Sequence, residues 1–333
     1  MPADNGGPLR HVRVLVTGAG GPAAVSVLKS LRPDPTVELL AADMDPWAAG
    51  LYLVPAEART LVPAGSAADF VAVTYTRCTD LRVDVLVPTV DSELEPLDRA
   101  REEFARAGIE LLLAPGPALS VCLDKLALAR RCAGVVRVPR TEILGETDPG
   151  SWSYPVVVKP RRGSGSRDIS IVESGADLAR LALDPGFLIQ EFLPGEEFSI
   201  DVLADVNGEV IASVPRVRSR VDSGVSVAGR TVHDPGLERF GADVMTAAGL
   251  TYIANVQARR DTAGRPALLE VNPRVPGTLP LTMASGIDMP RLALDSMRGR
   301  PLPGHADFAE IAMVRFLEER FIELSEVEKV AAG

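Results

Sequence analysis

One segment of the chain combines a lysine, arginines and small residues in a pattern suited to phosphate binding. From Lys159 to Arg167 the chain reads KPRRGSGSR, directly after the apolar run at residues 156–158. Backbone N–H groups of a small-residue loop can surround phosphate oxygens, and the basic side chains add positive charge. A solvated surface hairpin is the alternative, and no P-loop motif G-x-x-x-x-G-K-[ST] occurs. The apolar strand that leads into the lysine favours phosphate binding.

A second segment, which reads EVNPR, has side chains that suit a metal ion. Successive side chains of a strand point to opposite faces, so Glu270 and Asn272 share a face, and Arg274 joins them if the strand continues. Carboxylate and amide oxygens are ligands that Mg²⁺ accepts beside phosphate oxygens and water. Gln257, on the preceding β-rich run, could add a third oxygen. An exposed polar strand face is the alternative, but Pro273 interrupts the strand directly after the polar pair, as expected at a site.

The glycine-rich turn near the N-terminus has two interpretations. Residues 18–23 fit the dinucleotide-binding pattern G-x-G-x-x-A, and Asp43 ends the next strand, where an acid would bind ribose. Alternatively, the turn faces a small carboxylate or another ligand at the carboxyl edge of the sheet, where residues 89–93 also emerge. The candidate substrate residues at this edge are Gly20, Gly21 and Asp91.

A third segment, QEFLPGEE at residues 190–197, ends an apolar strand. Pro194 and Gly195 would force backbone groups out of the strand ladder. Such groups can pair with a purine edge, and a following carboxylate can accept hydrogen bonds from ribose hydroxyls. By itself, a β-bulge and turn explains the segment equally well.

Composition limits the classes of protein to which the chain can belong. Its 333 residues are 46% hydrophobic and 24% charged, with a formal net charge of -10, which disfavours binding to nucleic acid or to an anionic membrane. No apolar run is long enough to cross a bilayer and no secretory signal precedes the first strand, so we expect a cytoplasmic protein. Three cysteines without CxxC spacing and three histidines make a His/Cys metal site improbable.

The elements that position these residues change in character along the chain. β-rich runs alternate with helical runs at first, which predicts an α/β domain with a parallel sheet. Later, β-rich runs follow one another and Asn207-Gly208 predicts a hairpin, so an α+β region is expected. The expected strands are residues 11–17, 37–42, 83–87, 109–113, 154–159, 169–172, 187–192, 198–204, 209–214, 252–259 and 266–271. The expected helices include residues 23–31, 67–78, 92–107 and 118–133, whereas residues 308–330 remain unassigned.

In this order the motifs resemble the ATP-grasp superfamily, in particular the branch that contains the carbamoyl-phosphate synthase large chain and single-chain carboxylate-amine ligases. The resemblance covers roughly residues 12–300. It rests on DK at 124–125, VKP at 158–160, QEFLPGEE at 190–197, NVQ at 255–257 and LEVNPR at 269–274. It implies a pre-ATP-grasp α/β domain at residues 1–116, a central lobe at 117–186, a C-terminal lobe with the metal site at 187–305, and an extension at 306–333.

The resemblance also implies roles for individual residues in binding a nucleotide and a metal. The phosphate-binding residues would be Lys125 and Lys159, under a flap made by Gly163, Ser164, Gly165 and Ser166. Adenine would contact Glu191 and the backbone of Phe192 and Leu193, and ribose would contact Glu197 or else Glu196. The ligands of Mg²⁺ (or Mn²⁺) would be Gln257, Glu270 and Asn272. Lys159 and Arg274 would be catalytic, with Arg274 stabilising the transferring phosphoryl group.

Two departures from the family pattern affect the substrate site. Asp168 follows the flap where a glycine would be common, and residues 216–231 replace the histidine region of the synthases. We interpret residues 216–231 as a loop for the carboxylate substrate or its acyl phosphate, with a solvated basic strand as the alternative. The candidate residues in this loop are Arg216, Arg218, Arg220, Ser223 and Gly224.

The activity implied by the resemblance is an ATP-dependent ligation. A carboxylate would be activated as an acyl phosphate and joined to an amine, such as an amino acid, with release of ADP and phosphate. The expected cofactors are ATP and Mg²⁺ (or Mn²⁺), the expected partners are a small carboxylate and an amine, and a homodimer is left open. Two alternatives remain: an NAD(P)-dependent oxidoreductase built on the turn at residues 18–23, and a catalytically idle nucleotide-binding protein.

Overall fold

The computed structural model describes residues 11–163, 168–181, 184–222 and 225–332. The chain divides into two compact units: Met1–Leu113 together with Leu317–Gly333, and Ala114–Phe316. The tail at residues 306–333, expected as one extension, is therefore divided between the two units. No helix in the described ranges is long and apolar enough to cross a membrane.

The first unit is built on a parallel five-stranded sheet in the order β3-β2-β1-β4-β5. The strands are β1 (Val12–Val16), β2 (Val37–Asp43), β3 (Arg59–Leu61), β4 (Val85–Val87) and β5 (Glu110–Leu111). The central strands are apolar and buried, as expected of a parallel sheet covered on both faces. The structure thus confirms the predicted α/β class of this part of the chain.

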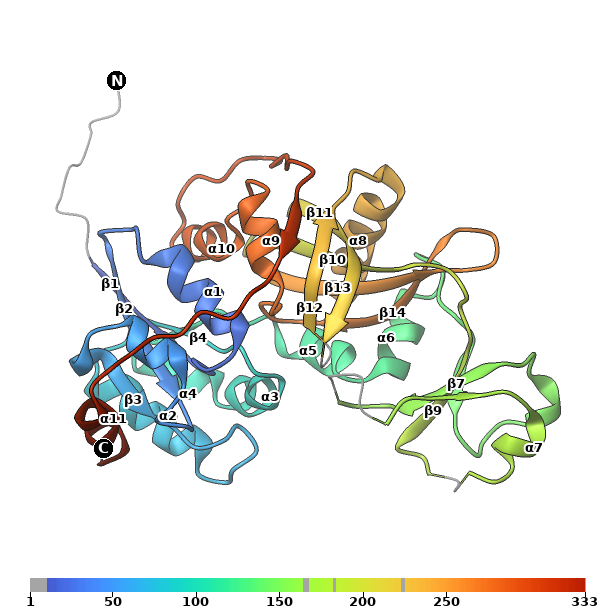
Figure 1. Cartoon of the computed structure of the whole chain (residues 1–333), viewed down its shortest axis with the longest axis horizontal. Coiled ribbons are helices and arrows are strands. Elements are labelled where there is room, and N and C mark those ends of the chain that lie inside the picture. The colour runs from blue at the N-terminus through green and yellow to red at the C-terminus, as the bar shows by residue number, and fades with distance from the viewer. Residues whose placement is uncertain (1–10, 164–167, 182–183, 223–224, 333) are drawn as a thin grey trace. The chain divides into compact units, whose positions relative to one another are not determined.

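Helices of the first unit connect these strands (Figure 1). They are α1 (Pro22–Leu31), α2 (Phe70–Asp80), α3 (Asp91–Arg99), α4 (Arg101–Arg106) and the short 3₁₀ helices Ala49–Leu53 and Ala56–Ala58. Residues 92–107, expected as one helix, instead form α3 and α4, which meet at Ala100.

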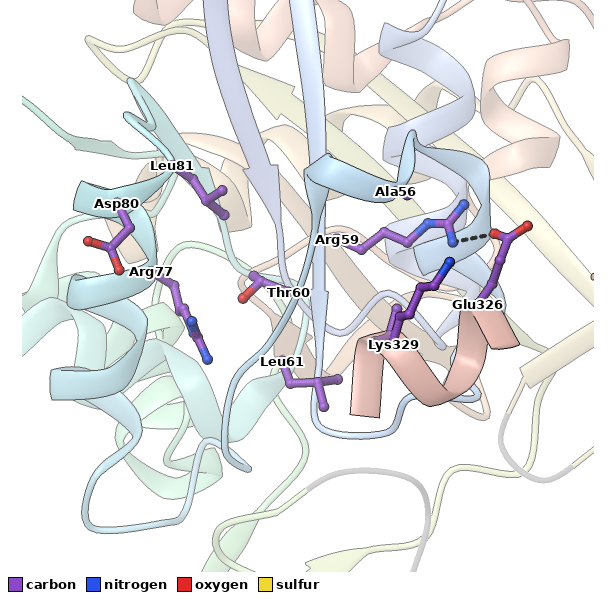
Figure 2. Close-up of a pocket in the computed structure, with 10 residues that line it drawn as sticks. Ala56, Arg59, Thr60, Leu61, Arg77, Asp80, Leu81, Glu326 and Lys329 are labelled. Carbon is purple, nitrogen blue, oxygen red and sulfur yellow. Dashed lines mark hydrogen bonds and ion pairs between the residues drawn. The ribbon is translucent and has the colours of Figure 1, made fainter. Parts of the chain in front are cut away.

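The C-terminal helix α11 (Leu324–Ala332) belongs to this same unit and packs beside β3. Figure 2 shows the contact: Arg59 of β3 forms an ion pair of 2.6 Å with Glu326 of α11, and Lys329 lies nearby. The hollow around this pair is also lined by Arg77 and Asp80 of α2. The tail that the sequence left unassigned therefore returns to the sheet edge formed by β3.

The second unit contains a small antiparallel sheet in the order β6-β9-β7-β8. Its strands are β6 (Thr141–Ile143), β7 (Val156–Pro160), β8 (Ser170–Val172) and β9 (Phe187–Glu191), with α7 (Gly175–Leu178) and the 3₁₀ helix Pro149–Ser151 beside them. Val156 and Val158 of β7 pack into a hydrophobic cluster with Trp152 and Ile189. Alternation along β7 therefore turns Lys159 away from this cluster.

Residues 118–133, expected as one helix, form two helices instead. These are α5 (Gly116–Cys122) and α6 (Lys125–Cys132). The Asp124 carboxylate accepts hydrogen bonds from Leu126 N and Ala127 N at 3.0 and 3.1 Å. This cap fixes the start of α6 and makes Lys125 its first residue.

A larger antiparallel sheet follows, in the order β14-β13-β10-β11-β12-β15. Its strands are β10 (Glu197–Ala204), β11 (Val210–Asp222), β12 (Val225–Thr231), β13 (Tyr252–Arg260), β14 (Pro266–Asn272) and β15 (Ala312–Val314), and its helices are α8 (Pro235–Ala248), α9 (Leu279–Ala284) and α10 (Met289–Met297). The predicted turn at Asn207-Gly208 is confirmed, since it joins the antiparallel pair β10 and β11. The interpretation of residues 216–231 as a loop was wrong, because most of them belong to β11 and β12.

We predict that Gly50→Ala destabilises the first unit. A Cβ atom at this position would lie 2.2 Å from the backbone oxygen of Ala19, to which Gly50 N donates a hydrogen bond of 3.0 Å. Because backbone must move to relieve the clash, we expect a loss of about 1–3 kcal/mol in the free energy of unfolding. Hydrogen exchange of peptides from β1 and β2 measures the loss. Gly304→Ala is the control, since nothing lies within 4 Å of its added Cβ; equal protection in both variants would contradict the prediction.

Candidate functional site

One face of the six-stranded sheet brings together polar side chains from several strands. Residues directly opposite each other in an antiparallel pair point to the same face. The register places Glu270 opposite Gln257, Gln257 opposite Ser199, and Ser199 opposite Arg216. Helix α8 covers the other face, where an added Cβ on Gly241 would lie 2.7 Å from Ile200 Cγ2. We call the face of Glu270 and Arg216 the polar face.

Lys159 is buried at the edge of this polar face. The register of β13 and β14 passes from Gln257–Glu270 to Ala258–Leu268, so Leu269 is an extra, bulged residue. A bulge leaves backbone groups outside the strand ladder. Lys159 Nζ donates to the oxygen of Leu269 at 3.3 Å. The bulge thus joins the end of β7 to the strand that contains Glu270.

Burial changes the acid–base behaviour of Lys159. Desolvation lowers the pKa of its ammonium group from 10.5 to about 8, although Glu270 and Glu197 oppose the fall and Lys125 adds to it. Lys159 therefore has a lysine and two carboxylates close enough to affect its charge. A buried cation with so little compensation is suited to an anionic ligand.

Lys125 reaches the same place from the start of α6. Its backbone N donates to Arg161 O at 3.0 Å, and its Nζ donates to Gly163 O at 2.7 Å. Lys125 Nζ also lies 3.5 Å from Glu270 Oε2. The Arg161 guanidinium pairs with the capping Asp124 at 2.6 Å, which ties α6 to the chain that follows β7. The two lysines expected to bind phosphate therefore both lie beside Glu270.

The predicted metal ligands occupy neighbouring positions on the polar face. Gln257 and Glu270 are cross-strand partners, and Asn272 follows Glu270 by two residues on the same face. Among the described residues, no three His, Cys, Asp or Glu side chains cluster as a metal site. One carboxylate with two amide oxygens is too weak a set to bind a metal strongly alone, but it fits Mg²⁺ that also has phosphate oxygens as ligands.

Glu191, expected at an adenine site, has a strong partner that the sequence did not indicate. Arg137 Nη2 donates to both carboxylate oxygens, at 2.6 and 2.8 Å, and Arg140 N donates to Oε2 at 3.1 Å. Leu268 N donates to the backbone oxygen of Arg137 at 2.9 Å, so Arg137 links β9 to β14. The Glu191 carboxylate is therefore occupied in holding the two sheets of this unit together.

The chain after Glu191 retains groups that suit a purine. Phe192 is half-buried and Leu193 is buried. Within the described part of the chain, neither backbone N–H of this pair has a hydrogen-bond acceptor. Glu197 pairs with Arg218 on the neighbouring strand, whereas Glu196 is exposed. Of the two acids considered for ribose, only Glu197 therefore begins a strand of the polar face.

Arg216 does not lie where the sequence interpretation placed it. Its side chain is 2% exposed and forms an ion pair of 2.6 Å with Asp201, which is fully buried. Asp201 also accepts hydrogen bonds from Asn255 at 2.7 Å and Thr282 at 2.6 Å. Arg216 is thus buried in the sheet together with Asp201, and it is not an exposed substrate contact.

The other residues expected near the substrate are found in varied settings. Arg220 is exposed on β11. Arg274 follows β14, its backbone N donates to Asn272 O at 2.9 Å, and its Nη1 donates to Val275 O at 3.2 Å. The other expected residues of the flap and the substrate loop lie outside the described residues; they are Ser164, Gly165, Ser166, Ser223 and Gly224.

The glycine turn of the first unit is held by the acid that was considered for ribose. Gly20 N donates to Asp43 Oδ2 at 2.8 Å, and Asp45 N donates to Asp43 Oδ1 at 3.0 Å. Both carboxylate oxygens therefore stabilise local backbone, which weighs against the oxidoreductase interpretation. Asp91 begins α3 at the same carboxyl edge of the sheet, and Gly21 lies in the turn itself.

Glu93 is buried at this carboxyl edge of the sheet and was not among the candidate site residues predicted from the sequence. Thr17 Oγ1 donates to Glu93 Oε2 at 2.6 Å, and burial raises the pKa of the Glu93 carboxyl to about 7. The Thr17 hydroxyl and the backbone N of Val90, which precedes α3, both donate to this side chain, so Glu93 joins the end of β1 to the start of α3.

Arg315 is a further basic residue of the polar face that the sequence analysis missed. Its backbone N donates to Val227 O at 2.9 Å, directly after β15. Its side chain extends to the loop after β14, where Nη2 donates to Gly277 O. No motif surrounds this arginine in the sequence, so only the pairing of β15 with β12 reveals its position.

Two family models match separate parts of the chain. One, described as "ATP-grasp in the biosynthetic pathway with Ter operon", matches residues 183–320. The other, described as "PylC-like, N-terminal domain", matches residues 14–112. The first match includes the polar face, and the second includes the parallel sheet.

Curated relatives are distant and longer than the matched region. The chain is 28% identical over 253 residues to the carbamoyl phosphate synthase large chain of Xylella fastidiosa, which covers 68% of this chain and 21% of that protein. It is 31% identical over 163 residues to a D-alanine--D-alanine ligase of Gloeobacter violaceus, which covers 41% of this chain and 53% of the ligase. The chain therefore spans about a fifth and about half of these relatives.

Solved structures with the same fold include two enzymes whose names describe different activities. Biotin carboxylase from Campylobacter jejuni aligns with a TM-score of 0.74 at 17% identity, over 89% of this chain and 72% of that chain. L-amino acid ligase from Bacillus licheniformis aligns with a TM-score of 0.64 at 16% identity, over 88% and 75%. At such identities the likeness shows the fold alone, and it confirms the predicted combination of a parallel-sheet domain with antiparallel lobes.

We predict that Lys159→Met stabilises the protein at neutral pH. The fall of the pKa from 10.5 to about 8 corresponds to a cost of about 3 kcal/mol for the charged side chain in the folded state. Because the remaining carboxylates also lose a partner, we expect the free energy of unfolding to rise by roughly 1–3 kcal/mol.

The pH dependence of this gain follows from the sign of the shift. Below about pH 8, Lys159 is charged in both the folded and the unfolded protein, and the full electrostatic cost of burying its charge is present. Between about pH 8 and 10.5, Lys159 has lost its proton in the folded protein but keeps it in the unfolded protein. Stability of the unmodified protein therefore rises with pH in that window, and the advantage of the variant shrinks. Denaturant unfolding from pH 6 to 10 measures this, with exposed Lys29→Met as the control. A gain that stays constant across the range would contradict the assignment.

Proposed function

Because the chain is an ATP-grasp superfamily protein with a PylC-like N-terminal domain, we propose that it is an ATP-dependent carboxylate-amine ligase. In this proposal a carboxylate receives the γ-phosphoryl group of ATP and becomes an acyl phosphate. An amine, such as the amino group of an amino acid, then attacks the acyl carbon and displaces phosphate. The products are an amide, ADP and phosphate.

The observation that supports the proposal best is the position of Lys125 and Lys159 beside Glu270, a predicted metal ligand. Lys125 Nζ lies 3.5 Å from Glu270 Oε2, and Lys159 Nζ bonds to the residue that precedes Glu270. Glu197, the second carboxylate near Lys159, is paired with Arg218, so the two ammonium groups and Glu270 leave a net positive charge in a partly buried place. Such a place favours a polyanion, and electrostatic attraction is stronger there than in bulk water.

Oxygen ligands for a metal lie at the same place, as phosphoryl transfer requires. Glu270, Gln257 and Asn272 would hold Mg²⁺ together with phosphate oxygens of the nucleotide. When bound, Mg²⁺ supplies neutralisation of phosphate charge. The chain itself would orient the γ-phosphate through Lys125 and Lys159, and Arg274 would counter the charge that develops on the transferring group.

Adenine would bind at the strand end that follows Glu191. The N–H groups of Phe192 and Leu193 lack acceptors within the described residues, which suits a purine edge. Arg137 would hold this segment in place through its bond to the Glu191 carboxylate. Glu197, at the start of β10, would accept from ribose only if its pairing with Arg218 adjusts.

Two of the similar proteins support an amide-forming reaction, whereas carbamoyl phosphate synthase and biotin carboxylase are named for other activities. D-alanine--D-alanine ligase and L-amino acid ligase are named for joining amino acids. At 31% and 16% identity, these two proteins support the class of reaction and not a particular acid or amine.

We predict that the purified protein forms ADP and phosphate from Mg·ATP only when both an acid and an amine substrate are present. The measurement is a coupled ADP assay with mass spectrometry, using a library of organic acids combined with amino acids. A new mass equal to acid plus amine minus water supports ligation. Release of AMP and pyrophosphate would refute the acyl-phosphate route, and binding of Mg·ATP with no turnover across the library would favour an idle nucleotide-binding protein.

We predict that Glu270→Gln lowers the rate of ADP formation at least 100-fold while the protein remains folded. The substitution keeps the shape of the side chain and removes the only carboxylate among the three predicted metal ligands, so the metal loses its charged ligand. Unfolding measurements and Mg²⁺ titrations of the rate accompany the assay. Glu209→Gln, at an exposed turn of the same sheet, is the control. Unchanged Mg²⁺ dependence in Glu270→Gln would refute the metal assignment.

A further inference from the structure

Arg315 extends across the polar face from the edge of the six-stranded sheet. Met313 pairs with Gly229 and Arg315 N donates to Val227 O, so Arg315 lies two residues on from a position opposite β12. Gly229 is opposite Arg218, and residues two apart share a face. Arg315 therefore projects to the same face as Arg216, Arg218 and Glu270, and its bond to Gly277 holds it over that face.

The guanidinium of Arg315 is half-buried and has no acidic partner among the described residues. In the part of the chain that the structure describes, its side chain donates one hydrogen bond, to the backbone oxygen of Gly277. Two arginines of β11 on this face do have acidic partners: Arg216 pairs with Asp201, and Arg218 pairs with Glu197. Within the described ranges, the other four N–H donors of Arg315 bond to no protein group.

A second arginine adds positive charge at the same place. Burial lowers the pKa of Arg315, and the nearby charge of Arg216 lowers it further. Asp201 is the carboxylate that offsets Arg216, and it is shared with Asn255 and Thr282. In addition, Arg216 Nε is buried with no hydrogen-bond partner in the described structure. Two guanidiniums with one shared carboxylate leave an excess positive charge that an anion would neutralise.

We propose that Arg315 binds a carboxylate group of the ligase's substrates, with the buried Arg216–Asp201 pair as its support. This assignment rests on the proposed function. A guanidinium matches a carboxylate through two parallel hydrogen bonds, which gives orientation as well as attraction. The residue that contacts the substrate is then Arg315, which is accessible, and not Arg216, which is buried.

The spacing of the strands is consistent with one substrate reaching both ends of the site. Glu270, Gln257, Ser199 and Arg216 lie in one row across four adjacent strands. With roughly 4.8 Å between strands, the backbones at the two ends of the row are ~14 Å apart. Arg315 follows β15, two strands beyond Arg216, but its guanidinium bonds to Gly277 O in the loop after β14 and so extends back toward the strand that contains Glu270. The carboxylate bound by Arg315 belongs either to the acid substrate or to an amino acid that serves as the amine.

The test measures carboxylate binding by the full chain in calorimetry, with acetate, glycine and glycinamide as probes at constant ionic strength. Titrations are made with and without Mg·ADP. Arg315→Ala is expected to weaken acetate or glycine binding at least tenfold and to leave the Kd for Mg·ADP within twofold. Arg315→Lys, which keeps charge but loses the paired donors, is expected to fall between.

Arg230→Ala is the matched control, since Arg230 is an exposed residue of β12 that faces away from the polar face. It is expected to bind the probes like the unmodified protein. Glycine bound more tightly than acetate, with glycinamide not bound, assigns the carboxylate to an amino-acid substrate. Acetate bound more tightly than glycine assigns it to the acid substrate.

Other results overturn the proposal. One is a carboxylate affinity of Arg315→Ala within twofold of that of the unmodified protein, and another is the absence of carboxylate binding by the unmodified protein. A third is a parallel loss of stability and of Mg·ADP binding in Arg315→Ala, which would show that Arg315 only holds the strand. Absence of Mg·ADP binding to the unmodified protein counts instead against the proposed function, and the titrations without nucleotide then decide the role of Arg315.

Discussion

The buried ammonium group of Lys159 is the interaction on which the site depends. It is removed from water at the end of β7, and it reaches the bulged Leu269 one residue before Glu270. Because its charge is only partly offset, the folded state pays an electrostatic cost that a bound anion would relieve. Lys125 comes to the same place from a helix start fixed by the capping Asp124. The position of both lysines therefore follows from backbone features rather than from flexible loops.

The polar face is organised around a second buried charge, that of Asp201. This carboxylate binds Arg216, Asn255 and Thr282, which come from β11, β13 and α9. A buried ion pair does not in itself add stability, but losing one partner would leave an uncompensated charge. The pair fixes the strands that present Gln257 and Glu270. Charges of the site are thus linked through the sheet to residues that no ligand would touch.

Sequence patterns predicted the site where its residues lie near each other along one strand. Glu270 and Asn272 follow from the two-residue period of a strand, and the apolar run before Lys159 predicted both β7 and its terminal lysine. Residues 216–231 were less accessible to such reasoning. Their alternating arginines suit a solvated loop as well as a strand, and burial of Arg216 depends on Asp201, fifteen residues away. The ion pairs of Arg137 and Arg218 were missed for the same reason.

The sequence by itself determined the class of fold, an α/β part followed by an α+β part, and it indicated the candidate phosphate and metal residues. These predictions depend on the periodicity of side chains within each element and on motifs whose residues lie close together in the sequence. Only the tertiary structure decided which charges face one another. It placed Arg315 on the polar face through the pairing of β15 with β12, and it returned α11 to the first unit. Such pairings join residues distant in sequence, and their energies depend on burial that no local pattern encodes.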